Sequence, residues 1–173
     1  MNKPVFLLGF MGCGKTYWGS RVAAHLQLPF YDMDALIEAR HATSIAAIFE
    51  QFGEAAFRGI EQEVLHGCGG LGACIIAAGG GTPCFFDNMD WMNRVGYTIY
   101  LETPAAVLAE RLKDDYERRP LLANKSAGEL ETFISHLLAV RAPYYLLAQQ
   151  LIKQQSDTTA LLEQLVAAIA SEH

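Results

Sequence analysis

Short apolar runs alternate along the chain with longer segments in which apolar residues recur every three or four positions. The short runs are typical of buried strands, and the periodic segments are typical of amphipathic helices. The pattern predicts strands at residues 5–8, 30–32, 73–78, 97–101 and 151–152. Strands that alternate with helices favour an α/β fold with a mostly parallel sheet.

The predicted helices begin and end at residues that suit helix termini. A helix over residues 15–26 follows the first strand. Ser44 can cap a helix that Gly53 ends, and a second helix is expected over residues 54–66. Further helices are expected at positions that carry capping residues, namely Asp87, Thr103, Ser126 and Asp157.

The segment 113–125 differs from these elements because it is charged, contains Pro120 and joins two predicted helices. Connections of this length are uncommon and are often functional, for example as lids over a site. We therefore expect a lid at about residues 113–125. No internal repeat divides the chain, so residues 1–173 are expected to form a single domain.

Composition narrows the range of partners. The formal net charge is −6, whereas a nucleic-acid-binding protein usually carries a basic excess. The four cysteines show no zinc-site spacing, and no apolar run reaches the ~18 residues of a membrane span. These features predict a soluble, cytoplasmic protein that binds neither nucleic acid nor membrane and that works as a monomer.

One motif carries specific chemistry. Residues 9–16, GFMGCGKT, match the phosphate-loop pattern G-x-x-x-x-G-K-[ST], after a buried strand and at the start of a helix. Backbone N–H groups of such a loop hold phosphate oxygens, the lysine reaches the β- and γ-phosphates, and the hydroxyl holds Mg²⁺. We therefore expect ATP contacts from Gly12, Cys13, Gly14, Lys15, Thr16 and Tyr17.

Two carboxylates follow the second predicted strand, at Asp32 and Asp34. Residues two apart on a strand point the same way, so both are expected at the C-terminal edge of the sheet, where ligands of such sheets bind. One carboxylate would support Mg²⁺ and the other would hold a substrate hydroxyl. The alternative is one helix-capping aspartate and one solvated aspartate.

Three further patterns are individually weak. Arg58 and Glu61 share a helix face, which is more often a surface ion pair. Gly79-Gly80-Gly81 allows the backbone to approach a ligand closely, or forms a flexible turn. Arginines in the predicted lid and at a predicted helix end are common for ordinary reasons, and here they are Arg118, Arg119 and Arg141.

The combination and order of these motifs are more specific than any one of them. The set GFMGCGKT, DMD, FRGIE, AAGGG, RRPLL and RAPYY resembles the shikimate kinase family along roughly residues 5–145. The resemblance implies a three-layer P-loop kinase fold with a five-stranded parallel sheet in the order 2-3-1-4-5. It also implies Mg²⁺-dependent transfer of the ATP γ-phosphoryl group to the 3-hydroxyl of shikimate, a step of aromatic amino acid biosynthesis.

The same resemblance implies a role for each matching residue. Asp34 would anchor the reacting hydroxyl and is the candidate base, and Lys15 and Arg119 would be the other catalytic groups. Thr16 and Asp32 would support the metal, and Arg111 would contact adenine. The shikimate contacts would be Gly79, Gly80, Gly81 and the carboxylate-binding Arg58 and Arg141.

The sequence departs from the family pattern at three places. Tyr17 follows Thr16 where a second hydroxyl residue is usual, and Pro83 replaces an aliphatic residue. The spacing from Arg111 to Arg119 is one residue longer than usual.

Two other functions are alternatives to shikimate kinase. One is a P-loop kinase that acts on gluconate or a nucleoside monophosphate. The other is a non-catalytic nucleotide-binding module.

Overall fold

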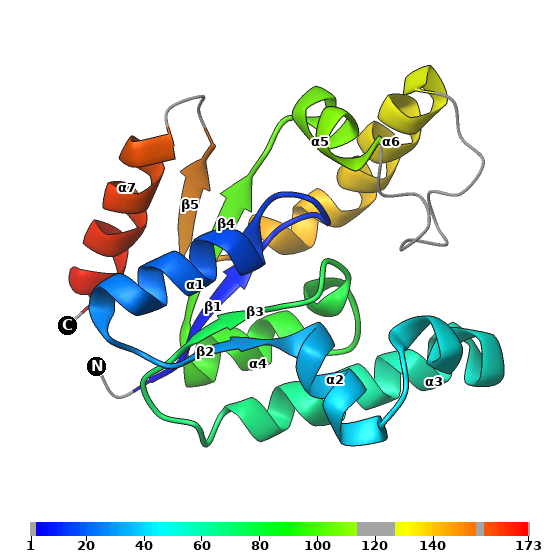
Figure 1. Ribbon diagram of the computed structural model, residues 1–173, viewed down its shortest axis with the longest axis horizontal. Helices are drawn as coiled ribbons and strands as arrows, with labels where there is room; N and C mark the ends of the chain where they lie inside the picture. The colour runs from blue at the N-terminus through cyan, green and yellow to red at the C-terminus, as the bar shows by residue number, and fades with distance from the viewer. Residues whose placement is uncertain (1–2, 114–126, 155–157, 173) are drawn as a thin grey trace.

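A computed structural model describes residues 3–113, 127–154 and 158–172 (Figure 1). These residues form a five-stranded sheet in the order β2-β3-β1-β4-β5, and every neighbouring pair is parallel. The expected fold class and strand order are therefore confirmed. The strands are β1 (Val5–Leu8), β2 (Phe30–Asp32), β3 (Ile75–Ala77), β4 (Tyr97–Glu102) and β5 (Gln150–Lys153).

Helices connect consecutive strands and cover both faces of the sheet, as parallel strands require. They are α1 (Lys15–Leu26), α2 (Met33–His41), α3 (Ile45–Cys68), the short 3₁₀-helix η1 (Thr82–Cys84), α4 (Asn88–Val95), α5 (Ala105–Leu112), α6 (Ala127–Tyr145) and α7 (Thr158–Ala170). Among the described residues, no helix is both long and apolar enough to cross a membrane.

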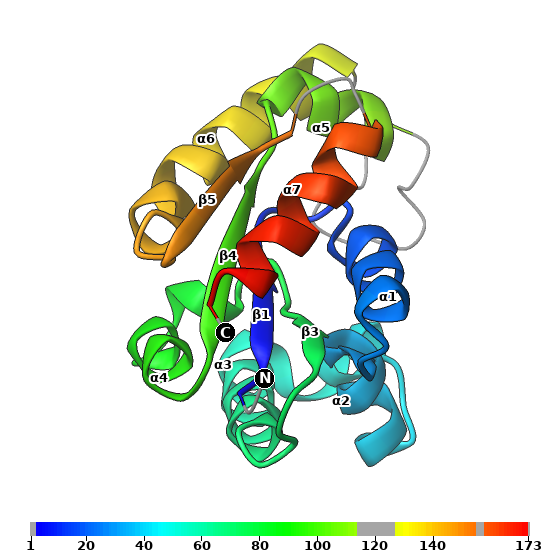
Figure 2. The same cartoon turned by 90° about the vertical axis from the view of Figure 1, so that its left-hand side faces the viewer.

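The apolar side chains of β1 alternate between two buried clusters, because successive strand residues point to opposite faces. Val5 and Leu7 pack with residues of α1, α5 and α7, including Val22, Leu108 and Leu165. Phe6 and Leu8 pack with α3 and α4, for example with Leu65 and Met92. Figure 2 shows β1 between the α1 side and the α3–α4 side of the molecule.

Helices α2 and α3 have a small apolar cluster of their own, formed by Ile37, Ile48, Phe57 and Val64. Ser44 caps α3 by accepting a hydrogen bond from the N–H of Ala47 at 3.2 Å, as expected. Gly53, with φ 77° and ψ 174°, interrupts α3 where the sequence predicted a boundary between two helices. A non-glycine residue rarely adopts this conformation, so the break depends on this glycine.

Several expected elements need correction or lie outside the description. Helix α2 was not expected, and α5 begins at Ala105 with Pro104, not the expected Thr103, at its N-cap. The expected caps Ser126 and Asp157 lie outside the described residues. The expected lid at 113–125 lies outside them too, apart from Lys113.

Candidate active site

The phosphate loop joins the end of β1 to the start of α1, at the C-terminal edge of the sheet. Gly14 is the N-cap of α1 and has φ 91°, a left-handed conformation that favours glycine. The ammonium group of Lys15 is buried and donates to the carbonyl oxygens of Gly9 at 2.8 Å and Phe10 at 3.0 Å. The cation therefore lies inside the loop, beside a helix N-terminus that favours anions.

Thr16 and Asp32 meet at the same edge from different elements. The Thr16 hydroxyl donates to Oδ2 of Asp32 at 2.5 Å, and Oδ1 of Asp32 accepts from the N–H of Asp34 at 3.0 Å. Asp32 therefore caps α2, and Asp34 lies in the first turn of that helix. The expectation that both carboxylates project from a strand is wrong, because the capping bond starts a helix immediately after Asp32.

The Thr16–Asp32 pair has the chemistry of a Mg²⁺ site in a phosphate-binding protein. Mg²⁺ usually keeps several waters and takes one or two protein oxygens together with substrate phosphates. One hydroxyl and one carboxylate beside a phosphate loop fit that requirement. Among the described residues, no group of three His, Cys, Asp or Glu side chains forms a metal site built entirely from protein ligands.

Arg58 belongs to a buried network and not to a surface ion pair. Its Nη1 donates to Glu61 at 2.9 Å and its Nη2 donates to Glu54 at 3.0 Å. The side chains of Arg58 and Glu61 are only 8% and 2% exposed. The second oxygen of Glu61 accepts from the hydroxyl of Thr82 at 2.6 Å, so the carboxylate is held from two sides.

The three glycines that follow β3 are close to these side chains and do not form a loose turn. A Cβ atom added at Gly81 would lie 2.7 Å from Nη1 of Arg58, and one at Gly79 would lie 2.6 Å from Oε1 of Glu61. The carboxylate of Asp34 would lie 3.5 Å from that second Cβ. Only glycine therefore lets the backbone reach this position between Asp34 and Arg58.

Arg141 approaches the glycine segment from α6. Its Nη1 donates to the carbonyl oxygen of Gly80 at 3.3 Å, and its Cζ lies 5.5 Å from the ring centroid of Phe10 in the phosphate loop. The residue is buried, with 8% of its surface exposed. Arg141 forms no ion pair with any carboxylate in the described part of the chain.

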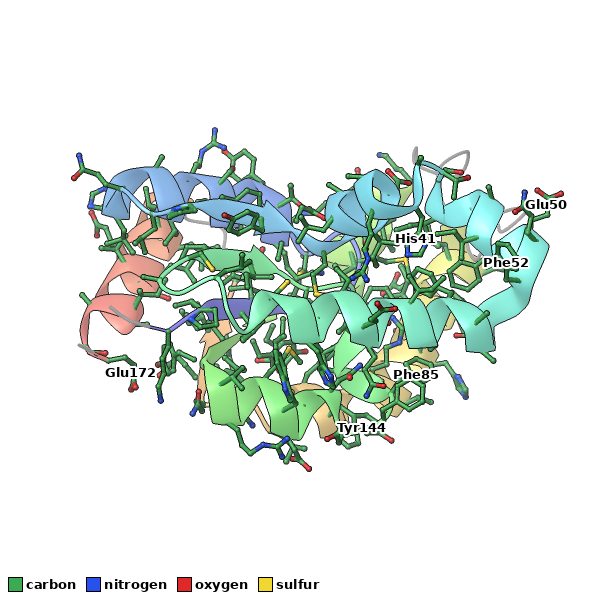
Figure 3. All side chains as sticks on the ribbon, turned by 90° about the horizontal axis from the view of Figure 1, so that it is seen from below. His41, Glu50, Phe52, Phe85, Tyr144 and Glu172 are labelled. Carbon is green, nitrogen blue, oxygen red and sulfur yellow. The ribbon has the colours of Figure 1, made fainter. Side chains whose placement is uncertain are left out.

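Two residues after the glycines, Cys84 and Phe85, interact with these cations. The ring of Phe85, labelled in Figure 3, covers the guanidinium of Arg58, with 4.1 Å between Cζ and the ring centroid. Burial raises the pKa of the Cys84 thiol from 9.0 to about 11, although Arg141 and Arg58 oppose the rise. The thiol is therefore neutral at physiological pH and places no extra negative charge beside the two arginines.

The outer side of the phosphate loop is held by Arg111 of α5 and by Gln154, which directly follows β5. Arg111 donates to the carbonyl oxygen of Gly12 at 3.3 Å and to Oε1 of Gln154 at 3.1 Å. Nε2 of Gln154 in turn donates to the carbonyl oxygen of Cys13. Tyr17 is 49% exposed, and the guanidinium of Arg21 lies over its ring, with Cζ 3.6 Å from the ring centroid.

The structure thus brings together most of the site residues that the sequence predicted. Arg119 lies outside the described residues, so its position relative to the others stays a prediction. Sequence reasoning missed Thr82, Tyr145 and Gln154. Tyr145 belongs to the RAPYY motif and Thr82 directly follows the glycines, whereas no local signal distinguishes Gln154.

A parallel sheet in this order, with a phosphate loop after β1 and a second polar site beside it, defines an ATP-dependent kinase of the P-loop class that acts on a small molecule. A sequence model of one family, described as shikimate kinase, matches residues 11–172. The chain belongs to the shikimate kinase family.

Individual relatives agree with this assignment. The chain is 45% identical over 141 residues to a shikimate kinase from Bacteroides fragilis, covering 82% of this chain and 79% of the relative. The crystal structure of shikimate kinase from Bacteroides thetaiotaomicron superposes with a TM-score of 0.92 at 36% identity, covering 98% of this chain and 99% of the other. The structure of shikimate kinase from Acinetobacter baumannii in complex with shikimate superposes with a TM-score of 0.90 at 31% identity, covering 99% of this chain and 95% of the other.

Proposed function

We propose that this protein transfers the γ-phosphoryl group of ATP to the 3-hydroxyl of shikimate. The observation that carries the proposal is the pair of buried arginines on either side of the glycine segment, next to the phosphate loop. Arg58 already has carboxylate partners, but Arg141 has none among the described residues. A substrate carboxylate would supply the missing anion, and guanidinium groups bind carboxylates through two parallel hydrogen bonds.

Asp34 is the group proposed to act on the reacting hydroxyl. Its carboxylate lies beside Gly79, 3.5 Å from a Cβ atom built there, and the arginines would hold the carboxylate end of the substrate. Asp34 accepts the hydroxyl's hydrogen bond, orients the oxygen toward phosphorus and takes the proton late in the transfer. The new bond joins this oxygen to phosphorus, the bond from phosphorus to the β–γ bridging oxygen breaks, and ADP leaves.

The residues of the phosphate loop balance charge during this transfer. Lys15 exchanges its loop carbonyl partners for phosphate oxygens and stays in place near the γ-phosphate. Arg119 would add a second cation from the lid, proposed at about residues 113–125. Arg111, beside the carbonyl of Gly12, is proposed to contact adenine.

The pair of Thr16 and Asp32 is proposed to support Mg²⁺, Thr16 directly and Asp32 directly or through water. Held by these two side chains, the ion would neutralise part of the negative charge of the nucleotide's phosphates. The hydrogen bond between the two side chains holds their oxygens close together. This arrangement requires little rearrangement when the metal–nucleotide complex arrives.

We further propose that residues 1–173 act as one cytoplasmic, monomeric domain that binds ATP and shikimate but neither nucleic acid nor membrane. The described cysteines are all free thiols, which suits a reducing compartment. The net charge of −6 disfavours a polyanionic partner. Light scattering after size-exclusion chromatography tests the oligomeric state.

A coupled assay that follows ADP release in the presence of Mg²⁺ tests the central proposal. Shikimate should support turnover, whereas gluconate, nucleoside monophosphates and a shikimate analogue without the carboxylate should support little. Nuclear magnetic resonance of the product should place the phosphate on the 3-oxygen. Equal turnover with gluconate, or no turnover with shikimate, would refute the proposal.

A further inference from the structure

The carbonyl oxygen of Gly80 accepts hydrogen bonds from two side chains of α6. The hydroxyl of Tyr145 donates to it at 2.5 Å, and Nη1 of Arg141 donates at 3.3 Å. The two donors are four residues apart, so they lie one above the other on the same helix face. Arg141 already has a proposed role in binding substrate, but Tyr145 has none.

Tyr145 is well suited to hold one geometry. The residue is completely buried, and its ring stacks on that of Tyr100 from β4 with centroids 5.0 Å apart and an interplanar angle of 28°. Burial raises the pKa of the Tyr145 phenol, an effect that outweighs the opposing charge of Arg141. The hydroxyl therefore stays protonated and remains a donor throughout the neutral pH range.

The carbonyl that Tyr145 holds belongs to the peptide between Gly80 and Gly81. A peptide flanked by two glycines can rotate more freely than any other, because neither neighbour has a Cβ atom. In a trans peptide, the C=O and the following N–H point in opposite directions. Fixing the carbonyl of Gly80 toward α6 therefore fixes the N–H of Gly81 on the opposite side.

We infer that Tyr145 is a positioning residue, whose hydroxyl locks the Gly80–Gly81 peptide so that its N–H is presented to the substrate. The inference rests on the proposed function, in which Gly80 and Gly81 contact shikimate. It also explains how Arg141 can bind substrate, since Tyr145 keeps the carbonyl in place when Arg141 turns its other N–H groups to a ligand. Gly80 additionally packs on the phosphate loop, where an added Cβ would lie 3.2 Å from the N of Met11.

The test is Tyr145→Phe, which removes the hydroxyl and keeps the ring stack. We expect the dissociation constant and KM for shikimate to rise by roughly 3- to 10-fold, the effect of one neutral hydrogen bond. The dissociation constant for ADP should change less than about twofold, because Tyr145 donates to no group of the phosphate loop. Tyr100→Phe is the matched control, because it removes a buried hydroxyl from the same ring stack but no donor to Gly80.

Restoring a hydrogen-bond donor at position 145 distinguishes a positioning role of Tyr145 from a packing role. Incorporation of 4-aminophenylalanine at position 145 restores a donor and should return shikimate affinity to near the wild-type value, even if the phenylalanine variant folds poorly. Unchanged shikimate affinity in Tyr145→Phe, equal weakening of shikimate and ADP, or an equal effect of Tyr100→Phe would overturn the inference. Wild-type turnover of shikimate is measured first, so failure of the proposed function is recognised separately.

Discussion

Replacing the two arginines of the proposed acceptor site one at a time should separate an effect on substrate binding from an effect on stability. Arg58 donates to both Glu54 and Glu61, and the side chain of Glu61 is only 2% exposed. Arg58→Ala therefore leaves a buried carboxylate without its cation. Arg141 forms no ion pair among the described residues, so Arg141→Ala leaves no buried carboxylate without its partner.

The two substitutions should therefore lower the stability of the fold by different amounts. Removing one partner of a buried ion pair costs about 3–5 kcal/mol, which lowers Tm by roughly 6–20 °C at about 2–4 °C per kcal/mol for a chain of this size. We expect this loss for Arg58→Ala and a Tm within a few degrees of wild type for Arg141→Ala. Truncating one partner of a buried charge pair with substrate costs roughly 2–5 kcal/mol, so both variants should bind shikimate about 30-fold more weakly or worse.

Isothermal titration calorimetry measures the dissociation constants for shikimate and ADP separately. Differential scanning calorimetry gives Tm. Lysine at either position should recover only part of the affinity, because an ammonium cannot make two parallel hydrogen bonds. Arg40→Ala is the control, since Arg40 and its partner Glu63 are 51% and 62% exposed, and it should change neither quantity. The reasoning is refuted if Arg141→Ala binds shikimate normally, or if Arg58→Ala melts like the wild type.

Four other predictions concern single residues. Lys15→Ala should lower kcat on the order of 10²-fold or more with the fold retained, and normal turnover would remove Lys15 from the mechanism. Asp34→Asn should abolish most transfer while ADP affinity stays near normal; a comparable loss of nucleotide affinity would instead indicate a metal-binding role. Gln154→Ala removes the donor to the Cys13 carbonyl and should raise KM for ATP several-fold with KM for shikimate unchanged, a selectivity that steady-state kinetics checks. Burial, and secondarily Cys68, raises the pKa of the Cys74 thiol from 9.0 to about 11. As the pH rises, the unfolded chain therefore loses this proton before the folded protein does. The free energy of unfolding should consequently fall between about pH 9 and 11. Denaturant titrations of Cys74→Ser should show a shallower alkaline decline, and an equally steep one would contradict the assignment.

The sequence predicted the strands well because each is a short apolar run, and the phosphate loop because its residues are adjacent. The strand order came from the resemblance to a family and not from the apolar pattern. Helix α2 escaped prediction since only Met33 and Ile37 are buried among its nine residues, which gives a weak periodic signal. The side-chain geometry of a strand was consequently applied to Asp32 and Asp34, although Asp34 lies in the first turn of α2.

The site residues that sequence reasoning missed are those whose contacts are with residues distant in the sequence. Tyr145 and Gly80 are 65 positions apart, and Gln154 and Cys13 are 141 apart. Both side chains bind backbone carbonyls, which every residue has, so no particular partner type could reveal them. Arg58 and Glu61 were recognisable as a pair from their spacing, but the burial that makes the pair important follows only from the packing of Phe85 and Thr82 around it.

Asp32 is shared by the two halves of the site, since one oxygen bonds Thr16 and the other starts the helix that carries Asp34. A ligand that moves this carboxylate also moves the first turn of α2, and the acceptor group with it. If Asp32 and Asp34 have the roles proposed above, the two substrates would be linked thermodynamically through the side chain of Asp32. Because such coupling is reciprocal, any factor by which the metal–nucleotide complex tightens acceptor binding is the factor by which the acceptor tightens nucleotide binding. The order in which the substrates arrive then leaves the final affinity of the ternary complex unchanged.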